Sequence, residues 1–350
     1  MLDQVALGVT EFALGGVFVG ALILFLWVVV FRGRARVGNA TPNVLSPPLK
    51  QTTFEAPESK PIQPIQKSRK RPTLPQVAEA TYLPLGELER IVEVLAQRKQ
   101  VVFFGPPGTG KTLLALEIAD FFTRNGGDYQ VVALHPSYDY SDMVEGIRPR
   151  SVGGQLDYPI VSGTLKRMAE LSRENPDARF VLILDEINRA NLSRVLGELI
   201  LLLEYRDSPV ILPFSGEAFS LPPNLFLIGT ANSADRSIAL IDFALRRRFA
   251  FFNFTPRSDV LIKFLSDYPP KGISVTMVVA LFEGLNRKIA ESKNLGAPYE
   301  IGHSYFMEKD MTTNALDRIW RTKLVPLLEE YYFDAPDELA DFQSLVKWVP

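Results

Sequence analysis

Short apolar runs alternate with helical patterns along the middle of the chain. The run at 100–105 follows a segment, 83–99, in which apolar residues recur at helical spacing. Three more apolar runs of strand length lie at 129–134, 179–186 and 224–232. Because helical patterns separate these runs, the sequence predicts an α/β fold, a parallel sheet with helices on both faces.

Two segments between the predicted strands look like hairpin insertions, 148–161 and 208–224. The second has a Ser-Gly turn and closes on Pro-Pro. Beyond residue 256 the pattern changes to several helices without a convincing strand. We therefore expect an α/β subdomain at 77–256 and a C-terminal helical lid at 257–350.

The N-terminal region contains a long apolar run. Over 12–31, 20 residues carry no charge, and at 1.5 Å per residue they reach across a hydrocarbon core of about 30 Å. A cleaved signal peptide is the main alternative, but the residues before the run lack its basic region. Arg32, Arg34 and Arg36 follow directly. The positive-inside rule then predicts a single transmembrane helix within 1–36, in the inner (cytoplasmic) membrane, with the N-terminus outside and the remainder in the cytoplasm.

Residues 37–76 are rich in proline and polar groups, which predicts a disordered linker. The whole chain has 38 basic and 40 acidic residues, so its net charge favours neither nucleic acid nor acidic lipid as a partner. It has no cysteine, which excludes disulfides and thiolate metal sites. Two histidines are too few for a histidine-built zinc site.

A phosphate-binding loop follows the first predicted strand and opens a helix, as the pattern G-x-x-x-x-G-K-[ST] requires. Its backbone N–H groups surround phosphate oxygens, Lys111 reaches the β- and γ-phosphates, and Thr112 gives a hydroxyl to Mg²⁺. The loop therefore predicts a nucleoside triphosphate bound with Mg²⁺. Its residues are Gly105, Pro106, Pro107, Gly108, Thr109, Gly110, Lys111 and Thr112.

Polar residues end two of the later strands. Asp185 arrives at the carboxyl edge of the sheet, where it can hold Mg²⁺, and Glu186 follows at the position of a base that activates water. Asn232 ends the next strand and could position that water or contact the γ-phosphate. These residues predict hydrolysis of a nucleoside triphosphate.

Three arginines, Arg246, Arg247 and Arg248, follow soon after Asn232. They are either a solvated helix end or a source of an arginine finger for a neighbouring subunit, which would neutralise charge in the transition state. The residues alone leave both interpretations open.

These features, in this order, resemble an AAA+ ATPase module. Longer stretches are similar to the motor of McrB-type restriction GTPases, and the similarity covers about residues 85–347. MoxR-type ATPases share part of the pattern, but the continuation SRVLGEL and the lid sequence IGHSYF favour McrB. The stretches that carry the resemblance are Leu184–Glu204, Pro222–Phe249, Ile301–Phe306 and Leu324–Asp334.

The resemblance implies further roles around the nucleotide. Asn188 would help hold the hydrolytic water and respond to a stimulating partner, Asn232 would be the sensor, and Asp235 lies in the family's signature stretch, 232–236. Here the chain reads Ala-Asn-Ser-Ala-Asp, whereas the family usually reads Met-Asn-Thr-Ala-Asp. His303, on the lid, falls where many AAA+ modules place an arginine that senses nucleotide.

The resemblance also implies an assembly. Arg247 and Arg248 would act in trans, which implies a homo-oligomeric ring, a hexamer, with a McrC-like stimulating or effector subunit. Guanine preference is characteristic of the family, so GTP is favoured over ATP. Restriction-type McrB proteins carry a DNA-reading domain where this chain has the apolar run and linker, so direct DNA binding is not expected.

We therefore expect a membrane-anchored ring motor, held to lipid through residues 12–31 and serving in defence against phage or foreign DNA. One alternative is a MoxR-like chaperone that uses ATP to remodel other proteins. The other is a nucleotide-gated scaffold, against which Glu186 argues because a scaffold needs no residue to activate water.

Overall fold

The structure, a computed structural model, describes residues 71–235 and 243–343. The apolar run at 12–31, the arginines after it and residues 37–70 of the expected linker lie outside these ranges. Within the described ranges, none of the helices has the length and apolar character needed to cross a membrane.

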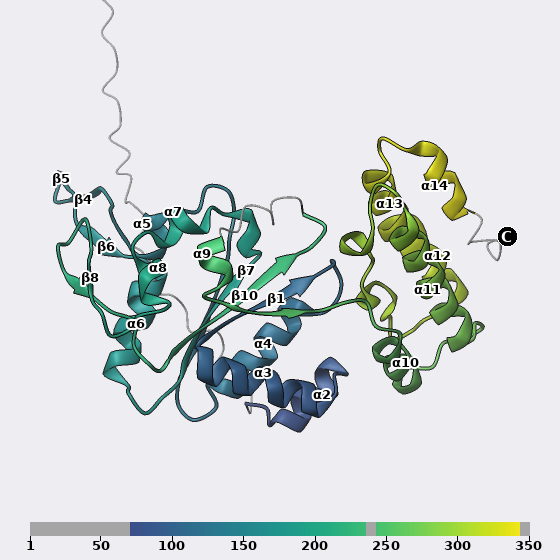
Figure 1. Cartoon of the computed structure of the whole chain (residues 1–350), viewed down its shortest axis with the longest axis horizontal. Helices are drawn as coiled ribbons and strands as arrows, with labels where there is room; N and C mark the ends of the chain where they lie inside the picture. The colour runs from purple at the N-terminus through teal and green to yellow at the C-terminus, as the bar shows by residue number, and fades with distance from the viewer. Residues whose placement is uncertain (1–70, 236–242, 344–350) are drawn as a thin grey trace, which may run out of the picture. The chain divides into compact units, whose positions relative to one another are not determined.

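A sheet of five strands forms the centre of the α/β subdomain (Figure 1). The strands all run parallel, in the spatial order β11–β1–β10–β7–β2. Four of them are the predicted apolar runs, and the fifth, β11, was not predicted. Their bounds are β1 (Gln100–Gly105), β2 (Tyr129–Ala133), β7 (Phe180–Asp185), β10 (Leu225–Asn232) and β11 (Ala250–Asn253).

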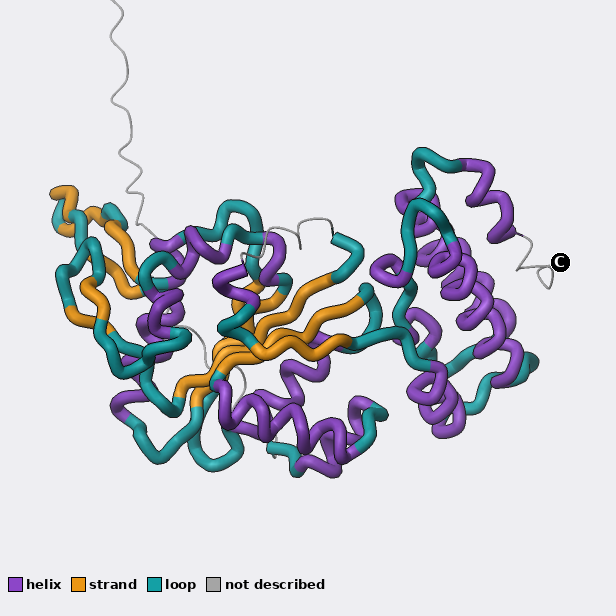
Figure 2. Tube along the Cα trace, in the orientation of Figure 1, coloured by secondary structure: helices purple, strands orange, loops and turns teal. Residues whose placement is uncertain are grey.

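Helices cover both faces of this sheet (Figure 2). Val181 and Ile183 of β7 join a core with α2, α3 and α4, whereas Leu182 and Leu184 join a second core on the opposite face. Both faces are buried, which explains why the strands read as continuous apolar runs. The helices are α2 (Leu74–Thr81), α3 (Leu85–Arg98), α4 (Lys111–Phe122), α5 (Tyr140–Met143), α6 (Thr164–Glu174), α7 (Leu192–Leu196), α8 (Leu199–Leu202) and α9 (Phe243–Arg246).

Helix α2 begins at Leu74, inside the segment expected to be linker. Its start follows from local chemistry, since Pro75 lies in the first turn, where its missing N–H costs nothing. Thr73 and Gln76 form a capping box, and the N–H of Thr73 donates to Gln76 Oε1 at 2.8 Å. The proline that suggested a linker is therefore a helix-start residue.

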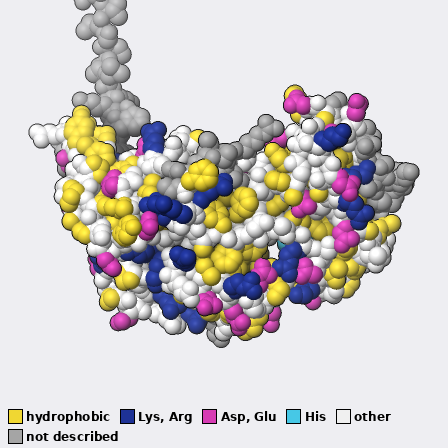
Figure 3. All heavy atoms as spheres, viewed as in Figure 1, with side chains coloured by type: hydrophobic (Ala, Val, Ile, Leu, Met, Phe, Trp, Pro, Cys, Tyr) yellow, Lys and Arg dark blue, Asp and Glu magenta, His cyan; other side chains and the backbone are white. Residues whose placement is uncertain are grey.

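Three antiparallel strand pairs extend the α/β subdomain in the described residues. One lies inside the first predicted insertion, 148–161, and a second encloses it. The pairs are β3 (Glu145–Ile147) with β6 (Ile160–Ser162), β4 (Arg150–Val152) with β5 (Gln155–Asp157), and β8 (Val210–Ile211) with β9 (Ala218–Phe219). Figure 3 shows apolar side chains gathered over this end of the molecule. Ile147, Leu156, Tyr158, Ile160 and Ile211 are each between 44% and 70% exposed, a grouping typical of surfaces that contact other molecules.

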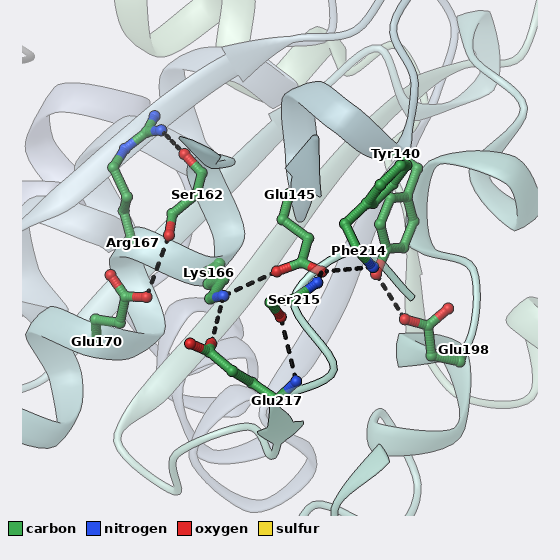
Figure 4. Close-up of polar contacts among 10 residues, drawn as sticks. All are labelled: Tyr140, Glu145, Ser162, Lys166, Arg167, Glu170, Glu198, Phe214, Ser215 and Glu217. Atoms are coloured by element: carbon green, nitrogen blue, oxygen red, sulfur yellow. Dashed lines mark hydrogen bonds and ion pairs between the residues drawn. The ribbon is translucent and has the colours of Figure 1, made fainter. Parts of the chain in front are cut away.

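A buried ion network ties the β8–β9 hairpin to β3 (Figure 4). Glu145 is fully buried and accepts hydrogen bonds from the backbone N–H groups of Phe214 and Ser215, at 3.1 and 2.9 Å. The Lys166 ammonium lies 2.9 Å from Glu145 and 2.7 Å from Glu217. The second predicted insertion is thus joined to β3 through the Glu145 carboxylate.

The lid has a hydrophobic core of its own, confirming the expected helical subdomain. Its largest fully buried side chains are Phe282 and Phe306, which pack edge to face at 5.6 Å between ring centroids. Its elements are α10 (Ser258–Asp267), α11 (Val275–Glu291), the 3₁₀ turns η3 (Ala297–Tyr299) and η4 (His303–Phe306), α12 (Thr313–Ile319), the π-helix η5 (Trp320–Leu324), α13 (Val325–Tyr331) and α14 (Pro336–Gln343).

Candidate functional site

The phosphate-binding loop joins β1 to α4, as the sequence predicts. Gly108 and Gly110 adopt left-handed backbone angles, with φ of 78° and 84°, which glycine reaches without strain. Lys111 is buried, and its ammonium donates to the carbonyls of Gly105 at 2.9 Å and Pro106 at 2.7 Å. Burial lowers the pKa of Lys111 to about 8, although Asp185 and Glu186 oppose this shift. The loop therefore holds a cation at the start of α4, where phosphate is expected.

Thr112 and Asp185 meet across the loop, with Thr112 Oγ1 donating to Asp185 Oδ1 at 2.9 Å. A hydroxyl and a carboxylate are oxygen donors of the kind that Mg²⁺ accepts in nucleotide sites. This donor set fits the expected ion, so Thr112 and Asp185 remain the residues that would hold it.

Glu186 and Asn232 also lie together. The amide of Asn232 donates to Glu186 Oε1 at 3.3 Å, and Arg189 Nε lies 2.5 Å from Glu186 Oε2. Glu186 itself has left-handed backbone angles, φ 57° and ψ 51°, so its side chain leaves the direction of β7. The residues predicted as base and sensor thus lie next to each other, as expected from adjacent parallel strands.

The signature stretch packs against the turn after β7. Asn188 is buried, and its amide donates to Asp235 Oδ2 at 2.9 Å. Its carbonyl oxygen accepts from the backbone N–H of Asn232 at 3.4 Å. Asn188 therefore links Asn232 and Asp235, while Arg236, the last residue of the stretch, lies outside the described residues.

The lid contacts the loop through the sequence IGHSYF. The N–H of Gly302 donates to the Pro107 carbonyl at 2.9 Å, and that of Ser304 to the Gly108 carbonyl at 3.0 Å. The approach needs glycine, because a Cβ at Gly302 would lie 1.9 Å from the carbonyl carbon of Gly108. Lid and loop thus meet backbone to backbone.

His303 is buried within this contact and accepts a hydrogen bond at Nδ1 from the backbone N–H of Arg257 at 3.3 Å. Burial, with the charge of Arg257, lowers the pKa of His303 to about 4, although Asp259 opposes this shift. At neutral pH the imidazole is uncharged, so it does not supply the positive charge expected of a nucleotide-sensing residue. Its geometry favours a structural role, joining η4 to the start of α10 within the lid.

The arginine pair divides into two different environments. Arg248 has a side chain only 10% exposed, and its guanidinium lies 3.0 Å from Glu204. The side chain of Arg247 is 70% exposed, at 4.0 Å from the same carboxylate. Arg247 is therefore accessible from outside the chain, whereas Arg248 is held against Glu204.

A cleft of about 260 Å³ is lined by the phosphate-binding loop together with Glu186 and Asn232. Thr230 lines it and was not singled out from the sequence, although a hydroxyl in the apolar run NLFLIGTAN is a visible signal. The lining residues are Pro107, Gly108, Gly110, Lys111, Thr112, Leu113, Glu186, Thr230 and Asn232.

Comparison with protein families covers both subdomains. Residues 100–249 match the AAA domain of the dynein-related subfamily, and residues 277–340 match the alpha-helical lid domain of McrB. This part of the chain is a McrB-like AAA+ module. The expected AAA+ P-loop fold with its helical lid is confirmed, and with it a family of nucleoside triphosphate hydrolases.

Two characterised relatives are restriction proteins. The Type IV methyl-directed restriction enzyme EcoKMcrB subunit of Escherichia coli (strain K12) is 36% identical over 272 residues, which cover 73% of this chain and 58% of the relative. The Type II restriction enzyme BsuMI component YdiS of Bacillus subtilis (strain 168) is 26% identical over 205 residues, 47% of this chain and 60% of the relative. The McrB-like chain thus spans about three fifths of each relative.

Proposed function

We propose that this chain is a membrane-tethered McrB-like motor that hydrolyses GTP in preference to ATP. The observation that carries the proposed hydrolysis is that Lys111, Thr112, Glu186 and Asn232 line one cleft, with Asp185 hydrogen-bonded to Thr112. Each supplies a different requirement of phosphoryl transfer to water.

Each of these residues has its own role in the hydrolysis of the nucleoside triphosphate. The loop N–H groups and Lys111 bind the β- and γ-phosphates, and Mg²⁺ held by Thr112 and Asp185 supplies positive charge to the phosphates when bound. Glu186 accepts a proton from the attacking water, whose oxygen bonds to the γ-phosphorus as the bond to the bridging oxygen breaks. The products are the nucleoside diphosphate and inorganic phosphate. Asn232 orients Glu186 or the water.

The assembly around this site is also a proposal. A homo-hexameric ring would allow Arg247 to reach the γ-phosphate of the neighbouring subunit, and its exposed side chain supports this. Both relatives are named as a subunit or component of a restriction enzyme, which supports a McrC-like partner and a role in defence against phage or foreign DNA. The apolar run at 12–31 and its following arginines support tethering to the inner membrane, with the motor in the cytoplasm.

Turnover by the full chain in detergent micelles tests the proposal. Phosphate release is measured with GTP and with ATP, each with Mg²⁺ and with EDTA, using Glu186→Gln as the inactive control. We expect Mg²⁺-dependent GTP hydrolysis that exceeds ATP hydrolysis. Hydrolysis of ATP alone would instead favour the MoxR-like chaperone, and absence of hydrolysis would favour the scaffold.

A further inference from the structure

Thr230 carries a hydroxyl near the carboxyl end of β10, the middle strand of the sheet. It is 2% exposed and lies between Phe103 of β1, its register partner, and the end of β7. Its neighbours Ile228 and Ala231 are apolar and buried. A hydroxyl buried here is costly unless it is hydrogen-bonded.

That hydroxyl is bonded on both sides. It donates to Asp185 Oδ1 at 2.6 Å and accepts the backbone N–H of Glu186 at 3.0 Å. The pairing of β7 with β10 ends at Leu184 and Gly229, so the N–H of Glu186 lies beyond the ladder. The Thr230 hydroxyl therefore accepts the N–H of Glu186, which has no backbone partner in the β7–β10 ladder.

The two bonds act on two different acids. Asp185 Oδ1 also accepts from Thr112, so the two hydroxyls together fix the rotation of this carboxylate. Glu186 has a left-handed backbone, which is unfavourable for a residue with a Cβ. The bond from its N–H to Thr230 helps to hold this conformation, which turns the Glu186 side chain towards Asn232.

We propose that Thr230 is a positioning residue, whose hydroxyl sets Asp185 for the metal ion and Glu186 for the attacking water at the same time. This rests on the proposed hydrolysis of a nucleoside triphosphate. Threonine suits the task because its branched Cβ restricts χ1 and so fixes the hydroxyl. Thr230 contacts neither substrate nor metal in this scheme and acts through the two acids.

The test compares Thr230→Val, which keeps the shape and removes the hydroxyl, with Thr230→Ser, which keeps the hydroxyl. Both are made in the full chain in detergent. The matched control is Thr123→Val, because Thr123 is also fully buried and its hydroxyl bonds only the Ala119 carbonyl, far from both acids in the sequence. Measurements are kcat, KM for GTP and the Mg²⁺ concentration for half-maximal turnover.

For Thr230→Val we expect kcat to fall about 10- to 100-fold, since a hydrogen bond to a charged group is lost and a buried N–H is left without its partner. The Mg²⁺ concentration for half-maximal turnover should rise several-fold, while the KM for GTP at saturating Mg²⁺ stays within about twofold. Thr230→Ser should recover most of kcat, and Thr123→Val should match the wild type. Equal kcat and Mg²⁺ dependence in Thr230→Val and wild type would overturn the proposal, as would a serine variant as impaired as the valine one.

A binding measurement separates this inference from the proposed hydrolysis. A fluorescent non-hydrolysable GTP analogue is titrated into each protein, in solutions of increasing Mg²⁺ concentration and in EDTA. The wild type should bind more tightly as Mg²⁺ is added, and Thr230→Val should need several-fold more Mg²⁺ to reach the same affinity while binding equally in EDTA. If the wild type shows this gain but no turnover, hydrolysis fails while the role of Thr230 is still tested. An unchanged Mg²⁺ requirement for binding in the variant overturns the role of Thr230. If Thr230→Val does not fold, Thr230→Ala against Thr230→Ser makes the same comparison.

Discussion

At the residue scale, Glu186 combines an unusual backbone with the chemistry assigned to it. Its left-handed conformation places its carboxylate between Asn232 and Arg189. On a regular strand the side chains of Asp185 and Glu186 would point to opposite faces of the sheet, so the turn is what lets both acids lie beside the phosphate-binding loop.

Glu186→Gln should retain nucleotide binding and lose turnover. Glutamine keeps the size of the side chain but cannot accept the proton from water, so kcat should fall about 100-fold or more. Phosphate release and binding of the fluorescent analogue measure the two properties separately. Unchanged turnover would show that another residue is the base.

His303 predicts a pH effect on stability. Its pKa is about 4 in the folded protein and about 6.5 when exposed, so the unfolded chain binds the extra proton between these values. The contribution of the neutral imidazole to the free energy of unfolding is therefore fully present above pH 6.5. It is lost as the pH falls towards 4, by roughly 3 kcal/mol at most.

His303→Gln tests this effect, because carboxylates that titrate in the same range are common to both proteins. Chemical denaturation at several pH values should show wild-type stability falling relative to the variant between pH 6.5 and 4. A constant difference across this range would mean that His303 is not held neutral.

At the element scale, the Glu145–Lys166–Glu217 network should govern the stability of the hairpins. Burial alone would raise the pKa of Glu145, but the Lys166 ammonium and the N–H of Ser215 outweigh it and hold the pKa below its usual value. A depressed carboxyl pKa stabilises the fold above the unfolded pKa, and this is lost as the pH falls through the folded value.

Lys166→Met leaves a fully buried carboxylate without its cation, so we expect a loss of about 3 kcal/mol in the free energy of unfolding at pH 7. The loss should shrink as the pH falls and Glu145 becomes protonated in the variant. Thermal denaturation measures it. Arg148→Met, at an exposed pair with Asp142, is the control and should cost less than about 1 kcal/mol. Equal effects at the two positions would contradict a buried network.

Sequence pattern was sufficient for elements whose signals are local. The apolar runs of β1, β2, β7 and β10 were found because burial on both faces leaves no polar interruption. Strand β11 was not predicted, because it has only four residues and these alternate between partly buried and exposed. The ion network could not be found, since Glu145 bonds residues 69 and 70 positions away, and no periodicity records such a pair.

The site follows the same division. Asp185, Glu186 and Asn232 were predicted together because parallel strands bring their carboxyl ends to one edge of a sheet. Thr230 was visible as a hydroxyl in an apolar run, but its partners depend on where the β7–β10 pairing ends. The neutrality of His303 depends on its burial where the lid meets the phosphate-binding loop, which comes from tertiary packing.

At the scale of the whole molecule, the proposed ring predicts that each subunit completes the site of the next. Arg247 and Arg248 both lie near Glu204, but their side chains are 70% and 10% exposed. Arg247 is therefore the better candidate to reach the site of a neighbouring subunit. Arg247→Ala should leave nucleotide binding intact and lower kcat about 100-fold or more, as expected for an arginine finger. Arg318→Ala is the control, since this lid arginine has a similarly exposed side chain, 61%, and should not change kcat.

Mixing variants decides whether Arg247 acts in trans. Arg247→Ala subunits keep Glu186 but supply no finger, whereas Glu186→Gln subunits keep Arg247 but have no base. If the finger crosses between subunits, a ring holding both variants contains sites that pair an intact Glu186 with an intact Arg247, because neighbours contribute one each. Phosphate release from the mixture should then exceed that of either variant alone, and it should depend on the mixing ratio. A mixture no more active than its components, in rings shown to contain both variants, would place Arg247 in its own subunit's site or outside the reaction.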